Sequence, residues 1–414
     1  MVGTLSRVTA LLISVSILLT GHGLQLTLLP VHAQLLGWGD YAIGLTGSLY
    51  FLGFVIGCAV IPSVVAGVGH IRTFMVMGAI ATIALLAAGL WPQLGVWLVL
   101  RGASGFALAG LYMVIESWLS EVSPHEQRGR VLAIYTLISL LAMALGQAFM
   151  GVGSPASLQL FMVGGILLCL AIVPLGLARV ASPAPVPALR FTPRILLRAS
   201  RVSVVCAFFA GLVVGSFWAL GPVVGRAFGL DGGAIGALMS VGILGGAVAQ
   251  VPVGRWSDHT DRRLVIGTLM LAGAGTALLG ALFATQSPLL LYLAMFCIGA
   301  TTMPLYALCI ANASDHTDIP LVEVASGILM IHSIGAIIGP VSVAALLSRF
   351  GPESFFGYTL LCLIIPAVWA LHRYRSGTPE HEHAAGMANL PRTTQVAATL
   401  SAADDGLAAD EPAP

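Results

Sequence analysis

Long apolar stretches alternate with short polar clusters along the whole chain. A helix that spans a membrane needs about 20 mainly apolar residues, and stretches of this kind occur twelve times. The predicted spanning helices are 8–32, 41–66, 72–91, 95–119, 130–152, 157–178, 202–225, 232–256, 263–285, 288–312, 323–348 and 354–373. Turn-forming clusters such as Gly37 to Asp40 and Asp231 to Gly233 separate them. The pattern therefore predicts an all-α polytopic membrane protein with twelve transmembrane helices.

Composition supports a lipid environment and narrows the class of partner. Of the 414 residues, 58% are hydrophobic and 8% are charged, whereas a soluble domain carries about 25% charged residues. Such a chain cannot cover its apolar surface in water, so we expect the lipid bilayer to be its main solvent. The 18 basic and 17 acidic residues nearly balance, which argues against nucleic acid as a partner.

The arginines predict the orientation. Every basic residue of the chain is Arg, which together with abundant Ala and Gly is typical of a GC-rich bacterial genome. If the N-terminus is inside, only Arg226 and Arg349 fall in outside loops, and nearly all other arginines are cytoplasmic. This agrees with the positive-inside rule. We expect a multi-pass protein of the bacterial cytoplasmic (inner) membrane with both termini in the cytoplasm.

The sequence also repeats. Pro222 follows Pro30 by 192 positions, and Ala234 to Gly236 repeats Ala42 to Gly44 at the same offset. Because six spans return the chain to the same side, such a repeat predicts two six-helix bundles in parallel orientation. The predicted units are an N-terminal bundle (1–178), a cytoplasmic Pro/Arg-rich linker (179–201), a C-terminal bundle (202–373) and a disordered cytoplasmic tail (374–414).

One loop carries a recognisable spacing. Gly254 is followed by Asp258 and then by Arg262 and Arg263, which resembles the signature loop of the major facilitator superfamily. Asp258 can accept hydrogen bonds at a helix N-terminus, and the arginines can pair with carboxylates at neighbouring helix ends. We predict that this loop latches one conformation, the alternative being an ordinary basic turn. The corresponding first-half segment, 62–70, lacks the Gly and the Asp.

The fourth predicted helix carries a second motif of the same superfamily, Arg101 followed by Gly105. At 100° per residue, Arg101, Gly105, Tyr112 and Glu116 fall within about 60° of one helix face. An intramembrane Arg is a functional candidate because its burial is costly. Arg101 and Glu116 are about 22 Å apart along the helix axis, too far to pair directly. We expect this face to point into the bundle.

Alternatives stay open for both ionisable residues. Arg101 either faces the transport pathway, in proton coupling or anion contact, or is a buried structural Arg bonded to backbone carbonyls. Glu116 either forms a structural or gating salt bridge with Arg72, Arg128 or Arg130, or is a protonatable coupling site, or contacts the substrate.

In the superfamily fold, helices 1, 4, 7 and 10 line the central cavity, so the resemblance implies which polar residues belong to the pathway. His22 is the most specific candidate, because an imidazole can take up a proton near physiological pH. For each residue the alternative is an interhelical hydrogen bond. The candidate substrate or proton pathway is His22, Gln25, Arg101, Tyr112, Glu116, Trp218, Tyr306 and His332.

Gly335, Gly339 and Pro340 look like the Gly-rich antiporter motif of the superfamily. That motif belongs to the fifth helix, whereas these residues lie in the eleventh. We therefore interpret them as a seam of small residues that lets two helices approach closely.

Several segments together are similar to the YcaD-like branch of bacterial facilitator transporters, a resemblance that covers about residues 8–373. The segments are Val114 to Trp118, Arg128 to Tyr135, Gly215 to Phe217 leading to Pro222, and Val251 to Arg255.

The resulting hypothesis is a secondary transporter that moves a small organic solute by alternating access, coupled to protons. The sequence shows no phosphate-binding loop, catalytic constellation or metal-spaced cluster, so we expect no enzyme activity, cofactor or metal. We expect a monomer with a small-molecule substrate. The alternative is a non-transporting receptor or assembly protein that retains the fold.

Overall fold

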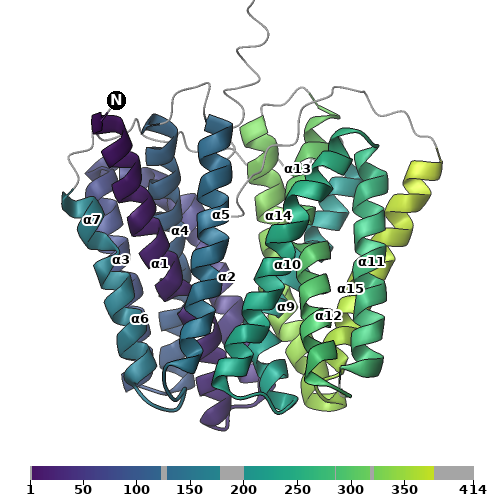
Figure 1. Cartoon of the computed structure of the whole chain (residues 1–414), viewed down its shortest axis with the longest axis horizontal. Helices are drawn as coiled ribbons and strands as arrows, with labels where there is room; N and C mark the ends of the chain where they lie inside the picture. The colour runs from purple at the N-terminus through teal and green to yellow at the C-terminus, as the bar shows by residue number, and fades with distance from the viewer. Residues whose placement is uncertain (1, 123–127, 178–199, 285, 318–320, 377–414) are drawn as a thin grey trace, which may run out of the picture.

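The computed structural model describes residues 2–122, 128–177, 200–284, 286–317 and 321–376. These residues form a bundle of long, roughly parallel helices (Figure 1). The helices are α1 (Val2–Leu35), α2 (Asp40–Val68), α3 (His70–Leu90), α4 (Leu94–Val122), α5 (Arg128–Ala148), the short 3-10 helix η2 (Phe149–Gly151), α6 (Gln159–Leu170), α7 (Ile172–Leu177), α9 (Arg201–Ala227), α10 (Gly232–Asp258), α11 (Arg262–Phe283), α12 (Pro288–Thr302), α13 (Leu305–Ser314), α14 (Leu321–Phe350) and α15 (Ser354–Arg375).

The described residues contain 12 helical segments that are long and apolar enough to cross a membrane. This confirms the predicted number of spans. Two predicted single helices are broken, since α6 and α7 share the sixth span and α12 and α13 share the tenth. The first break lies at Ala171, three residues before Pro174, and the second includes Pro304. A proline favours such a break because it lacks the backbone donor and its ring clashes with the preceding turn.

The 192-residue repeat is present in the fold. Asp40 begins α2 and Gly232 begins α10, 192 positions later. The preceding turns also match, because Gly37 and Gly229 both have a positive φ, of 78° and 86°, which glycine adopts without strain. Two parallel-repeat bundles of six spans are therefore confirmed. We call α1–α7 the N-half and α9–α15 the C-half; they lie side by side in Figure 1.

Most of the linker and most of the tail predicted from the sequence lie outside the described residues, so these domain boundaries stay predictions. Within the described part, α1, α4, α9 and the α12–α13 span are the most enclosed, with 67–78% of their most apolar window buried. For the other spans this share is 28–56%. The first, fourth, seventh and tenth spans are thus the central ones.

Glycines allow helices of the same half to pack closely. A Cβ atom added to Gly105 would lie 1.9 Å from the carbonyl oxygen of Tyr50 on α2, and one added to Gly335 would lie 2.2 Å from that of Phe208 on α9. Both positions therefore require glycine. The interpretation of Gly335 and Gly339 as a packing seam is confirmed.

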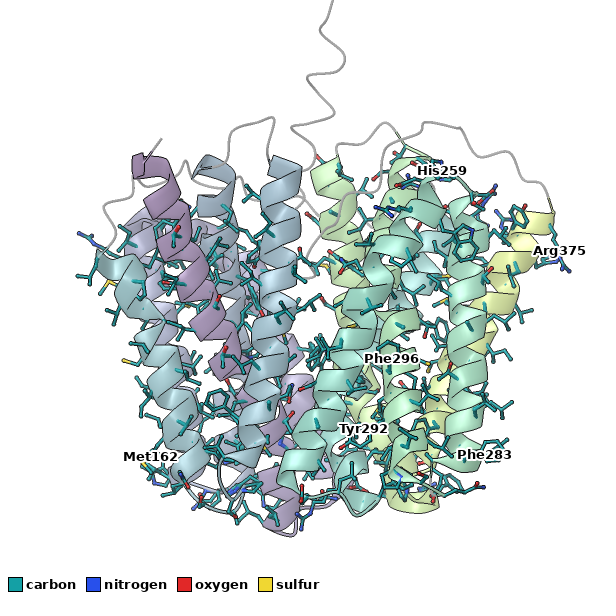
Figure 2. All side chains as sticks on the ribbon, viewed as in Figure 1. Met162, His259, Phe283, Tyr292, Phe296 and Arg375 are labelled. Atoms are coloured by element: carbon teal, nitrogen blue, oxygen red, sulfur yellow. The ribbon has the colours of Figure 1, made fainter. Side chains whose placement is uncertain are left out.

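The two ends of the bundle differ in how the halves meet. We call the end at which α1 begins and α15 ends the near face, and the opposite end the far face. Figure 2 shows His259 and Arg375 at the near face, and Met162 and Phe283 toward the far face.

Close contacts between the halves gather toward the far face. The hydroxyl of Ser240 on α10 donates to the carbonyl oxygen of Ala144 on α5 at 2.8 Å. The hydroxyl of Ser48 on α2 donates to the carbonyl oxygen of Ile337 on α14 at 2.5 Å. Small side chains let the backbones approach this closely, so the far face is sealed between the halves.

Candidate functional site

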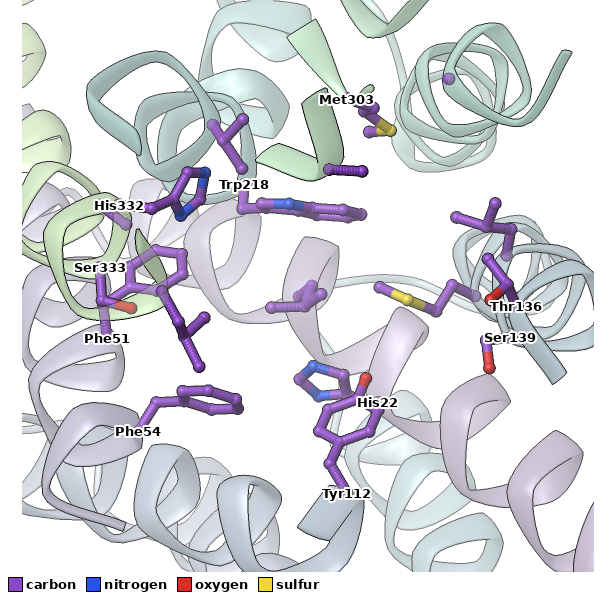
Figure 3. Close-up of a pocket in the computed structure, with 18 of the residues that line it drawn as sticks. His22, Phe51, Phe54, Tyr112, Thr136, Ser139, Trp218, Met303, His332 and Ser333 are labelled. Atoms are coloured by element: carbon purple, nitrogen blue, oxygen red, sulfur yellow. The ribbon is translucent and has the colours of Figure 1, made fainter. Parts of the chain in front are cut away.

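A cavity of about 190 Å³ lies between the two halves. Figure 3 shows side chains from both halves pointing into it. More than half of its lining residues belong to α2, α5, α10 and α14. The N-half contributes His22, Leu26, Tyr50, Phe51, Phe54, Tyr112, Thr136, Ser139, Leu140 and Met143, and the C-half contributes Val214, Trp218, Gly246, Gln250, Met303, Ala307, Leu329, His332, Ser333 and Ala336.

The lining follows the internal repeat. Three pairs of lining residues are separated by 192 positions, and four pairs on α5 and α14 by 193, so that equivalent points of the two halves face the same space. The pairs are His22 with Val214, Leu26 with Trp218, Phe54 with Gly246, Thr136 with Leu329, Ser139 with His332, Leu140 with Ser333, and Met143 with Ala336. The cavity therefore lies on the axis that relates the two halves, where a rocking motion displaces it least.

On the N-half wall, three side chains form a connected stack. The hydroxyl of Tyr50 and Nε2 of His22 are 3.2 Å apart, and the guanidinium carbon of Arg101 lies 4.6 Å from the centre of the Tyr50 ring. Nε of Arg101 also donates to the carbonyl oxygen of Thr46 at 3.4 Å. Arg101 is buried behind Tyr50 and does not itself line the cavity.

Gln25 lies behind the same wall. Its Nε2 donates to the hydroxyl of Ser104 at 2.8 Å, and both side chains are buried. This bond joins α1 to α4 next to the Arg101 motif. Gln25 is therefore placed beside the cavity rather than in it, and a direct contact with substrate stays a prediction.

Tyr112 and Glu116 lie on the inner face of α4, as the helical spacing predicted. Tyr112 lines the cavity, with its ring 6.5 Å from that of His22 in an edge-on contact. Glu116 is fully buried and accepts a hydrogen bond from the hydroxyl of Tyr135 at 3.4 Å. The side chains of Arg128 and Arg130, two of its predicted salt-bridge partners, lie outside the described residues.

The C-half wall is built around Trp218 and His332. Figure 3 shows both across the cavity from His22. Tyr306 lies behind His332, with ring centres 5.4 Å apart, and is buried without lining the cavity. Thus four of the eight predicted pathway residues line the cavity: His22, Tyr112, Trp218 and His332.

The sequence analysis missed the residues of α2 and α5 that line the cavity. Tyr50, Phe51 and Phe54 form one aromatic group on α2, and Thr136 and Ser139 are the hydroxyl groups of α5. The search considered polar residues of the helices that the resemblance made central. An aromatic cluster in an otherwise glycine-rich helix was the signal that pointed to α2.

The signature loop is organised by ion pairs within the C-half. Arg262, which is 8% exposed, pairs with Asp315 after α13 at 3.0 Å. Arg263 pairs with Asp261 at 2.8 Å, and Asp261 caps α11 by accepting from the backbone N–H of Arg263 at 2.8 Å. Pairing with a neighbouring helix end is therefore confirmed for Arg262, whereas Arg263 binds within its own loop. Asp258 is the last residue of α10.

Burial and hydrogen bonding act in opposite directions on Asp261. Burial raises its pKa, but hydrogen bonds from the side chain and backbone of Arg263, with the charges of Arg263 and His316, outweigh this. The pKa of Asp261 is therefore held below the ordinary value for an aspartate.

Family comparison decides which class this arrangement belongs to. The sequence matches the Major Facilitator Superfamily over residues 11–202 and 203–403, one match for each half. The chain belongs to the major facilitator superfamily. Members of this superfamily are membrane transporters rather than enzymes, and they bind small-molecule substrates in the membrane.

Two similar members of the superfamily are bacterial. An uncharacterized MFS-type transporter of Yersinia pestis (strain Pestoides F) is 27% identical over 342 residues, covering 80% of this chain and 86% of the relative. The uncharacterized MFS-type transporter YcaD of Escherichia coli O7:K1 is 27% identical over 358 residues, covering 85% of this chain and 92% of the relative. The predicted resemblance to the YcaD-like branch is confirmed.

Solved structures share the fold of this superfamily member at low identity. The nucleoside transporter NupG is similar with a TM-score of 0.75 and 13% identity, over 90% of this chain and 100% of NupG. A bacterial homolog of the human lysosomal transporter Spinster, in an inward-facing and occupied conformation, is similar with a TM-score of 0.71 and 16% identity, over 89% of this chain and 97% of that chain. At these identities the likeness extends to the fold alone.

Proposed function

We propose that this facilitator-superfamily protein is a secondary transporter that moves a small organic solute across the bacterial cytoplasmic membrane by alternating access. The observation that carries the proposal is the cavity on the repeat axis, built from equivalent positions of both halves and sealed from the far face. If the halves rock about this cavity, the seal opens and the near face closes. The solute site is then exposed to each side of the membrane in turn.

The orientation that we propose places the near face in the cytoplasm. The signature loop with Arg255, Arg262 and Arg263 lies at the end where α10 finishes, which is the near face. Arg226 and Arg349, the two arginines predicted to be outside, end α9 and α14 at the far face. The positive-inside rule supports this assignment. The conformation described is then closed toward the outside.

We further propose that a proton is the coupling ion. A proton-coupled cycle needs a group that gains and loses a proton while its access changes sides. His22 meets this need because its imidazole lines the cavity. Glu116 is the other candidate, as a buried carboxyl group one helical turn from Tyr112 on the near-face side. Arg101 would tune the charge of this wall through Tyr50.

A reversible cross-link of the far face tests alternating access. In a variant whose native cysteines are replaced by serine, Ala144→Cys and Ser240→Cys would place two thiols where the structure has a 2.8 Å hydrogen bond between these residues. The assay is the pH change inside proteoliposomes on addition of pooled metabolites and drugs. Oxidation should abolish the solute-dependent flux and reduction should restore it, with each single-cysteine variant as the matched control. Flux that survives quantitative cross-linking would contradict the proposal.

One observation favours a second candidate, a receptor or assembly protein that retains the fold. The positions that correspond to Gly254 and Asp258 are Pro62 and Ala66 in the N-half, so the signature loop exists once. Absence of flux with every pool, from a folded protein whose far-face cross-link forms, would favour this candidate.

A further inference from the structure

The lining of the cavity offers no carboxylate, ammonium or guanidinium group to a solute. Its twenty residues include aromatic, aliphatic, hydroxyl, amide and imidazole groups, but no Asp, Glu, Lys or Arg. The two ionisable residues of α4, Arg101 and Glu116, are buried in the N-half and do not line the cavity. An ion that left water for this space would lose its hydration without gaining a counter-charge, which is costly.

The N-half side of the cavity is formed by neighbouring aromatic rings. Phe54 of α2 and Tyr112 of α4 make an edge-on contact, with ring centres 6.3 Å apart and ring planes at 63°. Tyr50 and Phe51 continue this surface along α2, with ring centres 5.3 Å apart. All four residues line the cavity, and we call them the aromatic wall. Such rings favour an aromatic guest, which can meet them face-to-edge or in an offset stack.

Trp218 of α9 lies across the cavity from the aromatic wall (Figure 3). Its indole contacts Phe217 edge-on, with ring centres 5.3 Å apart and ring planes at 81°, and its side chain is only partly buried. The indole is therefore supported by the fold and still presents surface to the cavity. A ring placed between Trp218 and the aromatic wall would gain aromatic contacts on both sides, beyond the area that it buries.

A few uncharged polar groups are available beside these rings. The hydroxyl of Tyr112, Nε1 of Trp218 and the amide of Gln250 make no hydrogen bond to another described residue, and none of these atoms is fully buried. Each can serve one polar group of a solute. Because none brings a net charge, they suit a hydroxyl or amide group better than an ion.

The size of the cavity limits the solute further. Its volume is about 190 Å³, and an apolar protein cavity of about 150 Å³ binds benzene. The space therefore suits one aromatic ring with a short side chain. A solute that needs many hydrogen bonds, such as a sugar, would leave most of them unmade against the aromatic wall.

We propose that the solute is an uncharged compound with one aromatic ring and a short side chain that ends in a hydroxyl or amide group. Its ring lies between Trp218 and the aromatic wall, and its polar end bonds to the uncharged groups of the lining. This inference rests on the proposed transport function and names the substrate class of the same cavity.

Four matched probes test the charge and the ring separately. 2-Phenylethanol, phenylacetate and 2-phenylethylamine share one ring and differ in charge, whereas 2-cyclohexylethanol keeps the hydroxyl and lacks the aromatic ring. Binding would be measured by ligand-observed nuclear magnetic resonance on the protein in lipid nanodiscs, with empty nanodiscs as the blank, at about pH 8, where an ordinary imidazole is neutral. We expect 2-phenylethanol to bind at least about tenfold more tightly than either ion, and several-fold more tightly than 2-cyclohexylethanol.

Variants test where the ring and the polar end lie. Trp218→Leu and Phe54→Leu should each weaken binding of 2-phenylethanol about 2- to 10-fold. Trp91→Leu is the matched control, because Trp91 is 55% exposed and does not line the cavity, and it should leave binding unchanged. Gln250→Glu adds a carboxylate to the lining and should shift the preference toward 2-phenylethylamine, whereas Gln250→Leu should not. Thermal unfolding would be compared for each variant.

Tighter binding of either ion than of 2-phenylethanol, equal binding by the parent protein and Trp218→Leu, or no binding of any probe to folded protein would overturn the substrate class. Each of these results leaves alternating access to be judged by the far-face cross-link between Ala144→Cys and Ser240→Cys, so the two proposals fail independently.

Discussion

A single methyl group on α10 should shift the conformation of the transporter or weaken its fold, depending on where it is added. A Cβ atom at Gly236 would lie 2.2 Å from the carbonyl oxygen of Gln147, across the far-face seal between the halves. A Cβ atom at Gly245, on the same helix, would lie 2.1 Å from the carbonyl oxygen of Phe296 within the C-half. The two substitutions to alanine therefore create equal clashes at different kinds of interface.

The expected magnitude follows from the cost of overpacking, about 1–3 kcal/mol for an inserted carbon. Gly236→Ala can relieve its clash by opening the far face, so the ratio of far-open to far-closed protein should rise about 5- to 150-fold. Gly245→Ala meets its clash in both conformations. It should lower the free energy of unfolding by about 1–3 kcal/mol and leave the ratio unchanged.

The assay is labelling of one cavity residue from each face. Ser139→Cys, placed in a background whose native cysteines are replaced by serine, lines the cavity and would be treated with an impermeant thiol reagent in vesicles of either orientation. We expect far-face labelling to become faster with Gly236→Ala and to stay unchanged with Gly245→Ala. Equal effects of the two alanines, or faster labelling with Gly245→Ala, would refute the assignment of Gly236 to a seal between moving halves.

Three further predictions concern the signature loop. Asp315→Asn removes the carboxylate that pairs with Arg262 at 3.0 Å, so the free energy of unfolding should fall by about 1–3 kcal/mol, measured by chemical denaturation. Because the pKa of Asp261 is lowered in the folded protein, its stabilising contribution is complete above the ordinary aspartate pKa and is lost as pH falls through the folded value. Asp261→Asn should flatten the acid side of a pH scan of melting temperature, and an unchanged scan would remove this role. Asp258→Ala should slow turnover while leaving substrate affinity within a few fold; lost affinity with normal cycling would contradict the latch that we proposed for this loop.

The twelve spans and the parallel repeat could be predicted from the sequence. The spans depend on the length of each apolar stretch, and the repeat depends on a constant offset between similar residues. The offset of 192 residues, read from Pro30 and Pro222, recurs where α2 and α10 begin and in the turns at Gly37 and Gly229. Helix starts and glycine turns of this kind depend on residues that are adjacent in the sequence. They can therefore be predicted without knowledge of tertiary contacts.

The cavity was harder to predict because it depends on which side chain lies in front of another. Helical spacing placed Arg101 and Tyr112 on one face of α4, but only Tyr112 lines the cavity, since Tyr50 of α2 covers Arg101. No spacing within α4 reveals a covering residue on a different helix. The aromatic side chains of α2 were missed for the same reason.

The central claim is that the halves alternate about the cavity, and paired distance measurements by pulsed electron paramagnetic resonance test it most directly. Spin labels at Tyr41→Cys and Phe350→Cys would report the far face, and labels at Val68→Cys and Trp256→Cys the near face, since all four side chains are exposed. The account predicts two populations at each face, with the far-face distance increasing as the near-face distance decreases when solute and pH are varied. A single fixed distance at both faces, or distances that increase together, would contradict it.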